Sequence, residues 1–173
     1  LSSLNNKSNR QDNLWKPEEG KNTVRIVPYQ HQKDYPFIEM YFHYGIAPKR
    51  TLVSPITSGQ ADPIVEFADK LKSSGEKADW EMAKGFYPNM RTYVPVIVRG
   101  KENEGVKFWG FGKTVYQELL AIIADEDYGD ITDPTTGRDI TVEFTKGSVP
   151  TDNKTSIRVK PNTSVISDET SVI

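Results

Sequence analysis

The stretch RTYVPVIVRGKENEGVKFWGFGK, residues 91–113, predicts two β-strands joined by a charged turn. Side chains alternate between the two faces of a strand, so Val94, Val96 and Val98 would face the core. Val106 and Phe108 are the inward residues that this alternation predicts on the second strand. The opposite, water-facing side would then carry an unusual set of cations and aromatics: Arg91, Tyr93, Arg99, Lys107, Trp109 and Phe111.

Charge is distributed unevenly around this stretch. The whole chain has 173 residues and a net charge of −2, but residues 84–116 carry six Lys/Arg and two Asp/Glu, a net charge of +4. The same segment holds seven of the chain's eighteen aromatic residues. Residues 117–140, with one basic and seven acidic residues, have a net charge of −6. A local basic and aromatic segment is therefore compatible with a polyanionic ligand, despite the acidic whole.

Catalytic and metal-binding motifs are missing from the sequence. There is no cysteine, so no disulfide or thiolate metal site is expected, and the only histidines are His31 and His43. Nucleophile-elbow, P-loop and HExxH patterns are not found either. Residues 125–130 resemble the start of a calcium loop, but Asp130 and Thr136 stand where Gly and Glu are required. We expect a binding protein, not an enzyme, with no bound metal.

Period-two alternation predicts six strands. Their expected bounds are 23–29, 37–46, 91–99, 106–111, 139–145 and 155–160. A helical lobe is expected between the second and third of them, with one helix beginning at Asp62-Pro63 and another at 76–84. A third helix is expected from Gly112 to Ala124. No apolar run approaches the roughly 20 residues that span a bilayer, so no membrane association is expected.

This element order favours a mainly β, α+β fold: a five-stranded barrel of the oligonucleotide-binding (OB) type with extra strands and helices. Residues 1–13 are polar and aperiodic and are expected to form a disordered arm. Residues 14–165 would form one core, with an inserted lobe at about 47–90. Residues 166–173 would form a C-terminal segment.

The basic and aromatic face suits single-stranded nucleic acid, whose bases stack on aromatic rings and whose phosphates pair with cations. The expected stacking residues are Tyr93, Trp109, Phe111 and Tyr41, which shares an outward phase with His43. The expected phosphate ligands are Arg91, Arg99, Lys107 and Lys113. An alternative stays open, in which these aromatics pack beneath the inserted lobe and the cations only solvate its rim.

Several motifs resemble the core of the single-stranded-DNA-binding, helix-destabilising proteins of T-even bacteriophages and their marine relatives. They are Leu14-Trp15-Lys16, the run Thr23 to Pro28, His43-Tyr44-Gly45, and above all NEGVKFWGFGK at 103–113. The resemblance implies an OB-fold core that binds single-stranded DNA in replication, recombination and repair, in the cytoplasm of an infected bacterial host. In that family Trp109 matches a stacking aromatic, and Tyr93 matches another or its neighbour.

The sequence departs from the family where the family binds zinc through one His and three Cys. His43 matches the histidine, but Asp62 and Val65 stand where two thiolates are expected, so zinc is predicted to be absent. The family's basic N-terminal arm and long acidic C-terminal tail have no counterpart, so the chain is interpreted as the core fragment. The implied protein is a monomer that self-associates cooperatively on DNA and meets replication proteins through the missing tail. An RNA-binding OB module and a protein-interaction domain remain the alternatives.

Overall fold

The computed structural model describes residues 13–28, 35–48 and 50–166. Most of the predicted disordered arm, His31 and residues 167–173 lie outside the described residues. The chain divides into two compact units, of which the first holds the residues up to Ile38 and from Tyr93 onward. The second unit comprises Glu39–Thr92, a range that includes the whole of the predicted inserted lobe.

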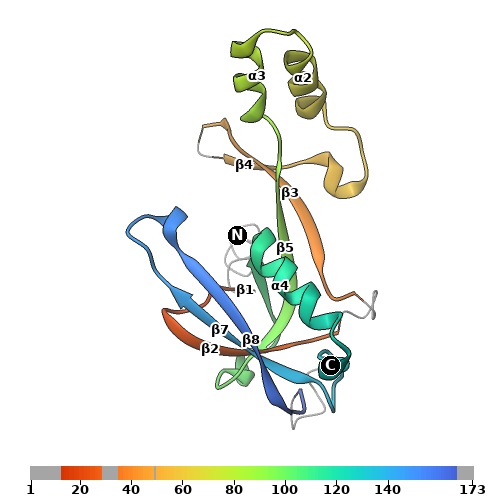
Figure 1. Cartoon of the computed structure of the whole chain (residues 1–173), viewed down its shortest axis with the longest axis vertical. Coiled ribbons are helices and arrows are strands. Elements are labelled where there is room, and N and C mark those ends of the chain that lie inside the picture. Colours follow the sequence, from red (N-terminus) through yellow and green to blue (C-terminus); the bar gives the residue numbers. More distant parts are fainter. Residues whose placement is uncertain (1–12, 29–34, 49, 167–173) are drawn as a thin grey trace, which may run out of the picture. The chain divides into compact units, whose positions relative to one another are not determined.

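The first unit is built from strands in the order β1-β6-β5-β2-β7-β8. Figure 1 labels all of these strands except β6. Strands β1 and β6 pair in parallel. The pairs β2–β5, β2–β7 and β7–β8 are antiparallel. Helix α4 follows β6 and packs against β8. The bounds are β1 Leu14–Trp15, β2 Gly20–Ile26, β5 Asn89–Val98, β6 Lys107–Phe111, α4 Lys113–Ile123, β7 Arg138–Thr145 and β8 Lys154–Thr163.

The second unit combines a β-hairpin with two helices, α2 and α3, that pack against each other. Asp62 caps α2 and Pro63 occupies its first turn, as the sequence predicts. The bounds are β3 Ile38–Ala47, β4 Arg50–Val53, α2 Pro63–Lys72 and α3 Lys77–Lys84. Short 3-10 helices occupy Pro55–Ser58 here and Glu102–Glu104, Glu126–Tyr128 and Pro150–Asp152 in the first unit.

The predicted mainly β, OB-like fold with a helical insertion is confirmed. All six predicted strands and all three predicted helices are present within a few residues of their expected bounds. The two strands that the sequence did not predict, β1 and β4, have two and four residues, too few to show a period. Val24, Ile26, Val94, Val96, Ile140 and Val142 are fully buried in the core of the first unit, as their alternation indicates.

The predicted phase of β6 is wrong. Trp109 is 1% exposed and Phe111 is 4% exposed, and both belong to the same core as the valines of β5. The Trp109 ring lies 4.7 Å from that of Phe111 and 5.7 Å from that of Trp15, both edge-on. Phe108, predicted to be inward, is only half-buried, and Val106 packs in a separate small cluster.

Apolar area explains why this phase is preferred. The five residues of β6 can turn either Trp109 and Phe111 or Phe108 and Gly110 toward the core. The first choice buries about one more large aromatic side chain, some 200 Å². At about 25 cal/mol per Å², that difference stabilises the observed phase by roughly 5 kcal/mol. Lys107, which shares the inward phase, stands at the end of the strand, where its ammonium can reach water.

We expect Trp109→Ala to destabilise the protein by about 3–5 kcal/mol, because it leaves a cavity beneath Trp15, Phe111 and the β5 valines. Chemical unfolding followed by circular dichroism measures this. Phe108→Ala, one residue away on the half-buried face, is the control and should cost clearly less. Equal losses for the two variants would contradict the phase described here.

Candidate nucleic-acid interface

Tyr93 lies on the outward side of β5, opposite the buried Val94, as its alternation predicts. Its ring passes directly over the backbone of Gly110 on β6. A Cβ placed on Gly110 would come within 2.6 Å of Tyr93 Cε1, so no larger residue fits beneath the ring in this position. The ring is half-buried, which leaves part of it accessible to a ligand. A tyrosine supported in this way is a suitable surface for a base to stack on.

Phe108, predicted to face the core, lies outside it. It shares the outward phase of β6 with Gly110, and it is half-buried. The sequence shows that Phe108 and Gly110 share one face of β6 and that Trp109 and Phe111 share the other. The prediction was wrong about which of the two faces meets the core. Phe108 therefore replaces Trp109 and Phe111 as the aromatic of β6 that accompanies Tyr93. The buried Trp109 and Phe111 have no surface on which a base could stack.

The two predicted phosphate ligands Lys107 and Lys113 of the first unit differ in their exposure. Lys113 opens α4 and is exposed. The Lys107 ammonium lies 3.7 Å from the Glu104 carboxylate, and its side chain is 16% exposed.

Arg99 has a different place from the one predicted. Its guanidinium donates to Asp139 (Nη2 to Oδ1, 2.9 Å), to the Val165 carbonyl (2.6 Å) and to the Ile166 carbonyl (2.9 Å). Ile166 itself is buried against Val27 and Ile97. Arg99 thus fastens the last described residues to β5 and β7, and we assign it that role in place of phosphate binding.

Tyr41 and Arg91 lie in the second unit, on β3 and β5, and both side chains are partly exposed. Their predicted roles in stacking and phosphate binding stay predictions. His43, which was expected to share the outward face of Tyr41, is buried, with 1% exposure. The predicted exposure of His43 was wrong, because the prediction took a polar side chain on β3 to face water.

His43 is buried because Asp62 supplies it with a hydrogen-bond partner. His43 Nε2 lies 2.7 Å from Asp62 Oδ2, and the Ser54 hydroxyl donates to the same oxygen. The other oxygen accepts from the backbone N–H groups of Ile64, at 2.8 Å, and Val65, at 3.4 Å. Burial raises the pKa of Asp62, but the hydrogen bonds from Ser54, His43 and Ile64 outweigh it and lower the pKa to about 2.

A zinc ion of the kind that the resemblance implies does not fit these residues. Zinc in a structural site takes four ligands, usually Cys and His. Here His43 Nε2 is committed to Asp62, Asp62 caps α2 through its other oxygen, and Val65 offers no donor atom. No group of three His, Cys, Asp or Glu side chains among the described residues could hold a metal ion. We therefore propose that the Ser54–Asp62–His43 network organises the second unit without metal.

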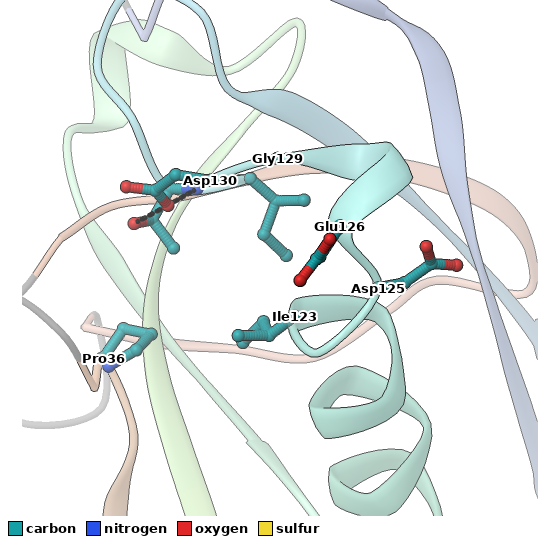
Figure 2. Close-up of a pocket in the computed structure, with 8 residues that line it drawn as sticks. Pro36, Ile123, Asp125, Glu126, Gly129 and Asp130 are labelled. Carbon is teal, nitrogen blue, oxygen red and sulfur yellow. Dashed lines mark hydrogen bonds between the residues drawn. The ribbon is translucent and has the colours of Figure 1, made fainter.

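A hollow of about 470 Å³ at the C-terminal end of α4 is unsuited to DNA (Figure 2). Its lining includes Asp125, Glu126 and Asp130, whose charge would repel phosphate. The three carboxylates are spread around the hollow instead of converging, and Asp130 accepts hydrogen bonds from the Thr132 N–H and hydroxyl. This arrangement does not form a calcium loop, as the departures from that pattern at Asp130 and Thr136 predict.

Comparison with known proteins identifies the family. The model of the gp32 DNA binding protein like family matches residues 18–171. The chain belongs to this family. Membership makes DNA the ligand class of the chain, since this is a family of DNA-binding proteins. No curated protein sequence matches the chain significantly. None of the helices in the described part of the chain is long and apolar enough to cross a membrane.

We expect Arg99→Lys to cost about 2 kcal/mol of stability, because an ammonium cannot reproduce the guanidinium's planar set of hydrogen bonds. Its affinity for oligo-dT should remain within about twofold of wild type, since the net charge is preserved. Thermal unfolding and a fluorescence titration measure the two quantities. A variant that keeps its stability but loses DNA would show instead that Arg99 meets phosphate.

We expect Asp62→Ala to destabilise the second unit by about 3 kcal/mol, because α2 loses its cap and His43 and Ser54 lose a buried partner. Since the folded-state pKa is below the ordinary 3.8, the wild-type carboxylate contributes fully above about pH 4 and loses its contribution as the pH falls toward 2. Hydrogen exchange of the α2 amides measures both effects.

Glu66→Ala, an exposed substitution in the first turn of the same helix, is the matched control and should have little effect.

A chelator should leave the melting temperature unchanged, and purified protein should hold no stoichiometric zinc. One zinc per chain, lost together with α2 protection, would overturn the metal-free interpretation.

Proposed function

We propose that this protein binds single-stranded DNA without sequence preference and has no enzymatic activity. The observation that carries the proposal is the Tyr93 ring supported by Gly110 on the outward face of β5 and β6, in a chain of a DNA-binding family. Every base has a flat face, so stacking on a ring is insensitive to sequence. A duplex keeps its bases stacked inside, which makes the single strand the form that this surface favours.

The proposed contacts divide into two kinds. Tyr93 and Phe108 stack bases on the first unit, and Tyr41 does so on the second. Lys107, Lys113 and Arg91 neutralise phosphates. In the resembling phage proteins such binding serves DNA replication, recombination and repair, and we propose the same setting here, in the cytoplasm of an infected bacterium. The protein would be a monomer that associates cooperatively along the strand and works beside replication enzymes.

RNA is the second candidate ligand, because the same aromatic and basic features bind either single strand. Family membership favours DNA. A direct competition between oligo-dT and oligo-U for the same protein separates the two. Tighter binding of oligo-U would replace DNA with RNA in the proposal.

The affinity for oligo-dT should fall steeply with salt. Each phosphate neutralised by a cation releases counterions, and the slope of log affinity against log salt is roughly −0.7 per contact on single strands. Three to five contacts predict a slope of about −2 to −4. A fluorescence titration repeated at four salt concentrations measures it. A slope near zero would remove the electrostatic part of the proposal, and no binding at any salt would remove the proposal itself.

Tyr93→Ala should weaken oligo-dT binding by about 1–3 kcal/mol, since one stacking surface is lost. Gly110→Ala is a sharper test, because it keeps the tyrosine and displaces its ring. Both variants should bind oligo-dT more weakly with nearly unchanged thermal stability.

Gly112→Ala is the matched control. Its Cβ would meet no atom within 4 Å, and its backbone, with φ of −89°, is open to any residue. Binding by Gly110→Ala at wild-type strength would show that the supported ring is not the stacking surface.

A further inference from the structure

The outward face of the β2-centred sheet carries a second group of cations, separate from Tyr93. Residues directly opposite each other on paired strands share a face. On β2, Lys21 and Thr23 lie opposite Glu143 and Thr141 of β7, and Thr141 in turn lies opposite Arg158 of β8. Lys160 follows two residues after Arg158 and therefore shares its face. Lys21, Arg158 and Lys160 are exposed.

Two adjoining hollows open on this side of the first unit, with volumes of about 460 and 350 Å³. Trp15, Glu18 and Lys101 line both of them. The two hollows therefore adjoin at these three residues, beside β1 and β2, and are together called the depression. The charged residues that line it are Lys16, Glu18, Lys21, Arg99, Lys101, Glu104, Lys107, Asp139 and Lys160.

The charge of this depression is positive after its ion pairs are counted. Lys101 pairs with Glu18 at 2.8 Å, Arg99 with Asp139 at 2.9 Å, and Lys107 with Glu104 at 3.7 Å. Each carboxylate of the lining is therefore paired with one cation. Three further lysines, Lys16, Lys21 and Lys160, form no ion pair within the lining and give it a net charge of +3, while Glu143, opposite Lys21, lies outside the lining. An anionic ligand would meet these three first.

Trp15 gives the depression an aromatic wall that is already oriented. β1 pairs with β6 so that Trp15 stands beside Trp109, and the two rings meet edge-on. The buried Trp109 thus supports Trp15 from the core side, while Trp15 remains half-buried and lines both hollows. The turn between β1 and β2 is fixed as well. The Asn22 amide accepts from the Glu18 N–H at 3.1 Å and donates to the Glu18 carbonyl at 2.7 Å.

We propose that this depression binds the phosphodiester backbone of single-stranded DNA, with Lys16, Lys21 and Lys160 as phosphate ligands and Trp15 as an aromatic contact. The inference rests on the proposed function and adds a second contact region on the first unit. Phosphate fits better than an apolar partner, because the lining is rich in lysine and Trp15 is its one aromatic residue among those described. A lining with a net positive charge also excludes a basic partner.

Charge reversal tests the depression without touching the core. Lys21→Glu and Lys160→Glu should each weaken oligo-dT binding about tenfold at low salt and reduce the salt slope by about 0.7 or more. Since Lys21 faces Glu143, the neutral Lys21→Gln is included to separate lost binding from repulsion within the sheet. Lys146→Glu is the matched control, because Lys146 is exposed in the same unit and lines neither hollow.

The outcomes separate this inference from the proposed function. If wild type binds oligo-dT, Tyr93→Ala weakens binding, and only the Lys21 and Lys160 variants add a loss beyond Lys146→Glu, the depression is a DNA site. If Tyr93→Ala weakens binding but the lysine variants match Lys146→Glu, the depression is not a DNA site and the proposed function stands. If wild type does not bind oligo-dT, both fall together.

Discussion

The burial of Trp109 is the constraint on which the first unit depends. The indole fills the space between Trp15, Phe111 and the β5 valines, and no smaller side chain would close that core. Once Trp109 faces inward, the alternation of β6 turns Phe108 and Gly110 outward. The same ring holds Trp15 in place at the edge strand β1. One buried side chain thereby determines which aromatics are available at two separate parts of the surface.

The second unit is organised around a buried carboxylate, that of Asp62, where the first unit is organised around the buried Trp109. Asp62 accepts four hydrogen bonds, from His43, Ser54 and two backbone N–H groups, and so joins β3 and the segment after β4 to the start of α2. A buried carboxylate is tolerable only when its oxygens are satisfied in this way. The oxygens of Asp62 are thus satisfied by hydrogen-bond donors from this unit itself.

Much of the fold could be predicted from the sequence, because its longer strands and capped helices carry local signals. The run from Val94 to Val98 fixed the phase of β5, and with it the outward position of Tyr93. β6 could not be resolved in the same way, since both of its faces carry apolar residues and only the volume of the core selects between them. The place of Arg99 could not be predicted, because its hydrogen-bond partners are 40 and more residues away in the chain. Lys16, Lys21 and Lys160 were overlooked because Lys160 is far from the other two in the chain.

Gly110 has a consequence for how this surface tolerates sequence change. Exposed strand positions usually accept many residues with little effect on folding. At Gly110 any side chain would occupy the space of the Tyr93 ring, while the backbone itself demands nothing special. On the proposed function, a library of variants sorted first for abundance and then for ligand capture should tolerate substitutions at this position in the first selection and lose them in the second. Loss in the first selection would show instead that the close approach of Tyr93 to Gly110 serves folding.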